Sequence, residues 1–331
     1  MQYSTAKGFS GWTALGMLII FLVAGFIVAA IFQFIISYGM LPAGTSFDKL
    51  PAALEAAMKD ERNVNSLRIM QVGSTFLMLC IPTILFSRLV NGRSYFWMGF
   101  NKHINITQIL VAFGIIFLAN IMAGPVADAS KALLKNLPAV DAMAHRLEQA
   151  YNEQVQVLSN LKSWGEYIAA IFIMAFFPAL FEEMFFRGAL QQHLEKWWKR
   201  PLLAISITAI IFSLIHFSIY HFLTRFVLGF VLGLLYHKTR NLWVNIIAHF
   251  LNNALAVTQL FFLSRQKTKP NIAELEPTVA WWLGLLALAA VIFLFWYLQK
   301  ITKQTRAAIA LQEQSLLATS ADPFGTITKQ D

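Results

Sequence analysis

Three apolar stretches of the chain carry polar side chains that could catalyse a hydrolysis. The stretches read MAFFPALFEEMFFRGAL, AIIFSLIHF and NIIAHFLNNA, and their polar residues are Glu182, Glu183, Arg187, His216, His249 and Asn253. An ionisable group in the hydrocarbon of a membrane costs several kcal/mol, so such groups usually face a protein interior or a water-filled cavity and act there. Carboxylates, imidazoles and an amide together predict a hydrolase that works below the membrane surface.

The two adjacent glutamates are expected to differ in role. Glu183 and Arg187 are four residues apart, with the acid first, which places them on one helix face and favours an ion pair. Such a pair makes both charges tolerable in lipid, so its predicted role is structural. Glu182 lies about 100° around the helix and stays unpaired. It could therefore act as the general base that takes a proton from water.

The two histidine motifs supply the remaining groups of a hydrolytic site. His249 and Asn253 are also four residues apart, so both side chains could donate to one oxyanion. His216 comes from another segment and could hold the attacking water or orient Glu182. Each motif alone would fit a hydrogen bond between helices, whereas all of them together favour a catalytic site.

Composition places the chain in a membrane. Hydrophobic residues make up 57% of it and charged residues only 13%, against about 25% charged residues in soluble domains. The net charge of +9 is explained by Lys and Arg flanking the membrane and does not indicate nucleic-acid binding. The single cysteine, Cys80, excludes an internal disulfide, and its apolar surroundings argue against a nucleophilic thiolate. Neither the H-E-x-x-H motif of zincins nor the G-x-S-x-G elbow of serine hydrolases occurs.

The apolar segments predict the architecture, since a spanning helix needs about 20 mostly apolar residues. We place spans at 12–38, 69–88, 105–127, 165–190, 201–218, 222–238, 242–263 and 278–299. The expected fold is an all-α membrane protein, a bundle of about eight transmembrane helices with a polar intramembrane cavity. The expected division is 1–164 for N-terminal transmembrane helices and amphipathic loops, 165–264 for the catalytic core, and 265–331 for the last transmembrane helix and a cytoplasmic tail.

Eight spans put both termini on one side of the membrane. The short loops on that side are densely basic, which favours a cytoplasmic location for both termini. On the opposite side, the loop 41–67 should contain a short surface helix begun by Pro51. The segment 138–162 has apolar residues at helical spacing and is read as an interfacial amphipathic helix, with a lid or substrate platform as the alternative. The polar tail after Lys303 is expected to be mobile.

The three motifs resemble those of the CAAX prenyl protease and bacteriocin-processing family, also called the CPBP or Abi family of intramembrane proteases. The family motifs E-E-x-x-x-R, F-x-x-x-H and H-x-x-x-N are similar to Glu182 to Arg187, Phe212 to His216 and His249 to Asn253. A proline before the glutamates, R-G after them and R-N-L-W before the last histidine fit as well. The resemblance covers about residues 170–260.

The resemblance implies peptide-bond hydrolysis in an eight-helix bundle whose polar cavity opens toward the cytosol. Glu182 would be the base for a water held with His216, and His249 and Asn253 would stabilise the oxyanion. Glu182, His216 and His249 could instead bind zinc and leave a position for water, so the cofactor is either none or Zn. The expected partners are membrane lipids and a peptide or protein substrate, lipidated or merely membrane-bound, but no nucleic acid. The expected location is a bacterial cell membrane.

Two other functions compete with an intramembrane endopeptidase. The first is a non-catalytic bacteriocin-immunity or scaffold protein on the same fold. The second is a proton-coupled transporter, because Glu, His and Arg inside a bundle also form proton relays. Transporters usually show internal repeats, whereas here the polar motifs cluster in the C-terminal half.

Overall fold

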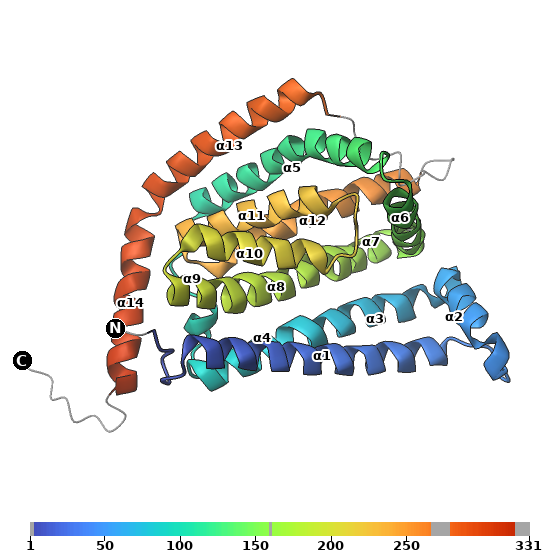
Figure 1. Ribbon diagram of the computed structural model, residues 1–331, viewed down its shortest axis with the longest axis horizontal. Coiled ribbons are helices and arrows are strands. Elements are labelled where there is room, and N and C mark those ends of the chain that lie inside the picture. The colour runs from blue at the N-terminus through green and yellow to red at the C-terminus, as the bar shows by residue number, and fades with distance from the viewer. Residues whose placement is uncertain (1–2, 159–160, 266–278, 322–331) are drawn as a thin grey trace, which may run out of the picture.

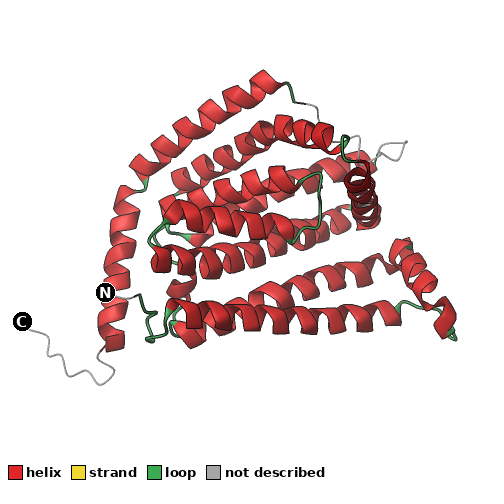
Figure 2. Ribbon diagram, in the orientation of Figure 1, coloured by secondary structure: helices red, strands yellow, loops and turns green. Residues whose placement is uncertain are grey.

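A computed structural model describes residues 3–158, 161–265 and 279–321 of the chain. Within these ranges the protein is almost entirely helical, without a β-strand (Figure 2). The prediction of an all-α membrane protein is confirmed. The C-terminal residues 322–331, and the first residue of the predicted span 278–299, lie outside the described residues.

Six helical segments are long and apolar enough to cross a membrane. They are Gly11–Gly39, Glu61–Val90, Ile106–Leu134, Trp164–Trp198, Leu242–Ser264 and Trp281–Ile301. Two of them are α helices with π-helical insertions. The second consists of α3 (Val64–Thr75), a π segment (Phe76–Cys80) and α4 (Ile81–Val90) after a 3-10 turn. The fourth consists of α7 (Trp164–Ala170), a π segment (Ile171–Phe176), α8 (Phe177–Glu183), a π segment (Met184–Gln191) and α9 (Gln192–Trp198).

The fifth and sixth predicted spans form helices that do not meet the requirements of length and apolar composition together. Helix α10 is Pro201–Leu214, with 14 residues, and α11 is Phe222–Thr239, with 18 residues. At 1.5 Å per residue α10 is only about 21 Å long, against about 30 Å of hydrocarbon. Of the eight predicted spans six therefore meet the requirement, and the count of eight stays a prediction.

The helices form two groups, which Figure 1 shows in its lower and upper halves. Helices α1 (Gly11–Gly39), α3 and α4 pack against one another in the lower group. In the upper group α12 (Leu242–Ser264) packs on α5 (Ile106–Leu134), α10 packs on α11, and α13 (Trp281–Ile301) covers the outer side of α5. The motif helix, which we define as residues 164–198, lies between the groups and contacts both.

Local sequence explains where the helices begin. Ser10 and Asn105 cap α1 and α5 by accepting a hydrogen bond from the backbone N–H of Thr13 and Thr107, respectively. Ser163 and Glu166 form a reciprocal capping box at the start of the motif helix. Each cap satisfies backbone donors that a helix end leaves without partners.

The two segments expected to be peripheral helices are helical. The loop 41–67 contains α2 (Leu50–Lys59) with Pro51 in its first turn, where a missing N–H has no cost. The segment 138–162 forms α6 (Pro138–Leu158), which stands across one end of the bundle in Figure 1.

The expectation of a mobile tail directly after Lys303 was wrong. Residues Lys303–Ala321 form helix α14, which docks against the end of the bundle where the chain begins. Ile309 is buried against Phe96 and Trp97, and Lys196 Nζ lies 2.5 Å from Glu313 Oε1. Burial of apolar side chains at this end orders a segment whose composition alone suggested mobility.

Candidate active site

The motif helix changes its hydrogen-bonding pattern immediately after the two glutamates. Glu182 and Glu183 end α8, and the following eight residues, which include Arg187, form the π segment Met184–Gln191. π segments inside α helices are rare and occur frequently at functional sites. The change of pattern fixes the directions in which the side chains of this motif point.

Glu183 is fully buried and receives hydrogen bonds from three side chains. Arg187 Nη1 donates to its Oε1 at 2.8 Å, and His249 Nδ1 lies 3.0 Å from the same oxygen. Asn245 Nδ2 donates to Oε2 at 3.1 Å. Both side chains of the Glu183–Arg187 pair are 0% exposed, so removal of either charge would leave the other buried and uncompensated.

A line of buried polar side chains continues from this ion pair along the motif helix. We call it the polar ladder; its members are Glu183, Arg187, Gln191 and Glu195. Its residues are spaced by four, so they share one helix face. Neighbouring members bond to each other at both ends of the ladder, between Arg187 and Glu183 and between Gln191 and Glu195, each at 2.8 Å.

Helix α11 supplies the partners on the other side of the ladder. Arg187 Nη2 donates to the carbonyl oxygen of Gly229 at 3.0 Å, and Gln191 Nε2 donates to that of Gly233 at 2.9 Å. A side chain at Gly233 would place its Cβ 2.7 Å from Ile205 and 3.0 Å from the Gln191 amide oxygen. Gly233 therefore lets α11 approach closely enough for its backbone to bind the ladder.

Gly188, the glycine that follows Arg187, is also explained by close packing. A Cβ on Gly188 would lie 2.6 Å from the carbonyl oxygen of Met98. Because a backbone carbonyl can move less easily than a side-chain tip, any larger residue here would push the 3-10 turn Tyr95–Met98 away from the motif helix. Glycine after Arg187 thus fits the packing around the ladder.

Glu182 has surroundings that differ from those of Glu183. It is half-buried, and no hydrogen bond or ion pair joins its carboxylate to another of the described residues. It lies close enough to His216 and to Arg187 to interact with both electrostatically. One carboxylate of the pair is therefore held by the protein, and the other is left without a partner among the described residues.

His216 lies beyond the end of α10, which corrects its expected position inside a helix. Helix α10 ends at Leu214, and Phe217 has a left-handed φ of 50°. Side chains replace the helical hydrogen bonds here. His216 Nδ1 lies 2.6 Å from the carbonyl oxygen of Phe212, and Arg225 Nη1 donates to the carbonyl oxygen of His216 at 3.2 Å. These contacts stop the helix and fix the imidazole.

The hydrogen bonds determine which nitrogen of each histidine carries a proton. A carbonyl oxygen only accepts, so His216 donates from Nδ1, and its Nε2 is an acceptor when the ring is neutral. Glu183 already accepts from Arg187 and Asn245 and is ionised, so His249 also donates from Nδ1 to this carboxylate. His249 can donate from Nε2 as well only when it is doubly protonated.

The asparagines of the third motif are placed on different sides of α12. Asn252 Oδ1 accepts a hydrogen bond of 2.7 Å from Asn120 Nδ2 and so links α12 to α5. Asn253 is half-buried, lies one helical turn after His249, and bonds to none of the described residues. Asn252 is therefore used in packing, whereas the amide of Asn253 has its donors available.

The described residues do not assemble a metal site. No three His, Cys, Asp or Glu side chains among residues 3–158, 161–265 and 279–321 come close enough together to hold a metal ion. This includes the predicted set Glu182, His216 and His249, which does not fit zinc as arranged. We therefore derive no step through a metal.

The loop between α10 and α11, residues 215–221, interrupts the bundle beside the site. Because α10 is about 21 Å long, the loop lies short of the far surface of a bilayer of full thickness. Non-helical backbone is tolerated at such depth only where it is buried in protein or lines a water-filled cavity. Water can therefore reach this part of the bundle, or α6 must cover it.

Helix α6 does contact this loop through polar side chains. Tyr220 donates from its hydroxyl to Asp141 Oδ1 at 2.6 Å, and this hydrogen bond raises the pKa of Tyr220 to about 12. His221 Nε2 lies 3.1 Å from Glu148 Oε1. The contacts show that α6 covers the loop that carries His216, which fits the alternative of a lid better than that of an isolated surface helix.

Asn245 and Arg225 are site residues that the sequence interpretation missed. Asn245 could have been found, because it precedes His249 by four residues, just as Asn253 follows it by four. The spacing N-x-x-x-H-x-x-x-N places all three on one face of α12. Arg225 is an unusual charge near the start of an apolar segment, and no periodicity links it to the His216 carbonyl.

Comparisons with known proteins agree with the motif assignment. Residues 164–255 match the family model described as Type II CAAX prenyl endopeptidase Rce1-like. The resemblance to the CAAX protease family is confirmed for this part of the chain, which contains all three motifs.

A Bacillus subtilis (strain 168) protein, described as Uncharacterized protein YpbD, is 33% identical over 118 residues. The matched region makes up 33% of this chain and 56% of YpbD, so it covers little more than half of that relative. No solved structure gives a significant match.

Proposed function

We propose that the chain, with its Rce1-like region at 164–255, is a membrane-embedded peptidase of the CAAX-protease type that cleaves by a glutamate-activated water. The single observation that carries the proposal is the contrast between the adjacent carboxylates. Glu183 is engaged by Arg187, Asn245 and His249, whereas Glu182 is unpartnered among the described residues and lies within electrostatic reach of His216. A partly buried, unpaired carboxylate beside an imidazole is suited to general-base catalysis.

In the proposed reaction Glu182 removes a proton from a water molecule that His216 Nε2 orients as hydrogen-bond acceptor. The water oxygen attacks the carbonyl carbon of the peptide bond, and the carbonyl oxygen becomes an oxyanion. Asn253 Nδ2 and His249 Nε2, in its doubly protonated form, donate to this oxygen. Glu182 then passes its proton to the departing amine as the carbon–nitrogen bond breaks.

The polar ladder supports this reaction without taking part in it. Arg187 and Asn245 hold Glu183, and Glu183 orients the His249 ring through Nδ1. Positioning of this kind keeps donors aimed at the place where charge develops. We propose the C-terminal region of a lipidated or membrane-bound peptide as the substrate, because the matched family is described as prenyl endopeptidases.

The test uses protein purified in detergent with two kinds of substrate, a fluorogenic prenylated peptide and a mixture of unmodified peptides whose new termini are found by mass spectrometry. Glu182→Gln should reduce kcat by about 100- to 10,000-fold, the usual contribution of a general base. Glu55→Gln is the matched control, because Glu55 is a mostly exposed carboxylate on α2. A chelator added to the wild-type enzyme should leave the rate unchanged.

Two results would contradict the proposal. If Glu182→Gln cleaves as fast as the wild type, Glu182 is not the base. If the wild type cleaves neither the prenylated peptide nor any of the unmodified peptides, the non-catalytic immunity or scaffold function is favoured. Loss of activity with chelator, restored by Zn²⁺, would replace the metal-free mechanism with a metal-dependent one.

A further inference from the structure

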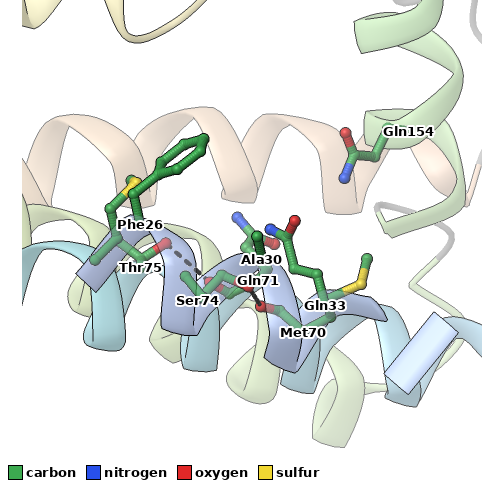
Figure 3. Close-up of a pocket in the computed structure, with 10 residues that line it drawn as sticks. Phe26, Ala30, Gln33, Met70, Gln71, Ser74, Thr75 and Gln154 are labelled. Carbon is green, nitrogen blue, oxygen red and sulfur yellow. Dashed lines mark hydrogen bonds between the residues drawn. The ribbon is translucent and has the colours of Figure 1, made fainter. Parts of the chain in front are cut away.

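A cavity of about 210 Å³ lies between α1, α3 and α6, separate from the histidines and glutamates of the site. Figure 3 shows that Gln33 of α1, Gln71 of α3 and Gln154 of α6 surround it. We call it the amide pocket. One water needs only about 10–15 Å³ of such volume, so the space is large enough for several residues' worth of backbone atoms.

The three glutamine amides have no hydrogen-bond partner among the described residues. The Oε1 atom of Gln71 is buried and unpaired. Gln33 is exposed on α1, a helix whose surface is otherwise almost entirely apolar. By contrast, the hydroxyls of Ser74 and Thr75, which also line the pocket, donate to carbonyl oxygens one turn earlier in their own helix.

An unpaired amide inside a membrane protein costs free energy that a ligand can recover. Each amide group both donates and accepts, so the fitting ligand also does both. No charged residue lines the pocket, which argues against a phosphate headgroup or a free carboxylate. Apolar wall residues, among them Phe26 and Met78, suit a chain with hydrophobic side chains. A peptide backbone has this chemistry.

The pocket adjoins the candidate active site through two contacts. The ring of Phe76, which follows the pocket residue Thr75, lies 5.5 Å from that of Phe181, which precedes Glu182. Helix α6 is the second connection, because it carries Gln154 into the pocket and Asp141 to the loop beside His216. The pocket is therefore next to the motif helix that carries Glu182 and to α6, which covers the loop of His216.

We infer that the amide pocket binds the backbone of the peptide substrate, in extended form, with Gln33, Gln71 and Gln154 pairing its N–H and C=O groups. The inference rests on the proposed function for its statement that the bound peptide is the substrate. The pocket would replace water around peptide groups that enter the membrane, where an unpaired group costs several kcal/mol. Because recognition is through the backbone, the pocket would accept many sequences.

The experiment measures binding without requiring cleavage. The full-length Glu182→Gln protein is immobilised in detergent and exposed to a random-sequence heptapeptide library with capped ends, and to the same library with N-methylated backbone amides. We expect retention of the first library and at least about 10-fold less retention of the second. Gln33→Leu and Gln71→Leu should each weaken retention about 3- to 10-fold, which corresponds to one lost hydrogen bond.

Matched controls separate the pocket from general effects. Gln149→Leu removes an exposed glutamine from α6 outside the pocket and should retain the library as well as the parent protein. Equal retention of both libraries, no retention of either, or unchanged retention by Gln33→Leu and Gln71→Leu would each overturn the inference. Displacement of the peptides by an uncharged diacylglycerol, but not by more peptide, would assign the pocket to lipid instead.

The two proposals can fail independently. If the purified enzyme cleaves no peptide but the library arms behave as expected, the pocket is a peptide site in a protein that is not a peptidase. If cleavage depends on Glu182 but the pocket variants keep full retention, the peptidase stands and the substrate backbone binds elsewhere.

Discussion

The polar ladder and the amide pocket both place polar side chains among apolar helices, but they differ in how these side chains are paired. Every ladder residue makes at least two hydrogen bonds or ion pairs within the protein. The three pocket glutamines make none with the described chain. Two buried ladder atoms, Arg187 Nε and Gln191 Oε1, also lack a partner, so the contrast is between side chains held by at least two bonds and side chains held by none. Side chains of the first kind serve the structure, whereas those of the second kind remain available to a ligand.

The same contrast occurs between Glu182 and Glu183, and substituting them should give the largest effect on stability. Glu183→Gln should reduce the free energy of unfolding by about 3–5 kcal/mol, because Arg187 would stay buried without its counter-charge. Glu182→Gln should change it by less than about 0.5 kcal/mol. Unfolding in mixed micelles with increasing denaturing detergent measures both. Equal losses in the two variants would show that Glu182 is also part of the structural network.

The second largest effect on stability is expected from replacing one glutamine of the polar ladder and, for comparison, one of the amide pocket. Gln191→Leu should cost about 1–3 kcal/mol, because Glu195 and the Gly233 carbonyl would each lose a donor. Gln71→Leu should be neutral or stabilising, because its amide has no partner to lose. The measurement is the same unfolding assay without peptide present. A cost for Gln71→Leu as large as that for Gln191→Leu would remove the distinction between the regions.

The cover over the His216 loop gives a smaller effect with a defined pH dependence. Tyr220→Phe removes the hydrogen bond to Asp141 and should cost about 1 kcal/mol at pH 8. Because the pKa of Tyr220 is raised from 10.0 to about 12, the folded protein favours the protonated phenol. The contribution is therefore complete below about pH 10 and is lost as the pH rises toward 12.

The check on this prediction is the difference between wild type and Tyr220→Phe in unfolding midpoint, taken at pH 8 and pH 11. The difference should shrink at the higher pH. A difference that stays constant, or grows, would mean that Tyr220 does not hold α6 through its hydroxyl proton.

The last prediction, with the smallest expected effect on stability, concerns which side of the membrane each end of α10 lies on. Cys80 is buried and is the sole cysteine, so a Cys80→Ala background is suitable for labelling single introduced cysteines. Arg200→Cys and Phe217→Cys are at exposed positions just before and just after α10. In sealed vesicles an impermeant maleimide should label them from opposite sides. Labelling from the same side would contradict the placement of the His216 loop on the α6 side.

The arrangement of the two ends of the bundle relates two predictions from the sequence, namely the cytoplasmic termini and the cytosolic opening of the cavity. The start of the chain and α14 lie at one end of the bundle, and the His216 loop lies toward the other, under α6. If both termini are cytoplasmic, that loop faces away from the cytosol. A cytosolic opening of the cavity, which the family resemblance implied, would then have to lie on the other side of His216.

Much of the helical architecture followed from the apolar runs, because a spanning segment needs a length and composition that few other structures share. The start of α12 at Leu242 and the end of α1 near Gly39 fall within one residue of the predicted bounds. The early end of α10 was missed, because the apolar run continues to Ile215 while the backbone is stopped by contacts from distant residues. The π segments were missed because apolar periodicity does not record which carbonyl a backbone N–H binds.

The candidate site was predictable where its residues share a helix and not where they meet across the fold. The pairing of Glu183 with Arg187 follows from spacing alone. The bond between Glu183 and His249 joins residues 66 positions apart, and no pattern in one sequence gives it. The amide pocket was missed for the same reason, since Gln33, Gln71 and Gln154 come from three separate helices.

The polar ladder also has a consequence for how the protein is made. An arginine at the centre of a membrane helix opposes insertion by about 2.5–3.5 kcal/mol, and the Gly229 carbonyl that binds Arg187 lies 42 residues later in the chain. At about 5–20 residues per second, the ribosome needs about 2–8 s to make that partner after Arg187 itself has been synthesised. During this interval Arg187 has only Glu183 of its own helix as a partner, so we expect the insertion machinery to retain the motif helix until α11 arrives and the two helices can leave together.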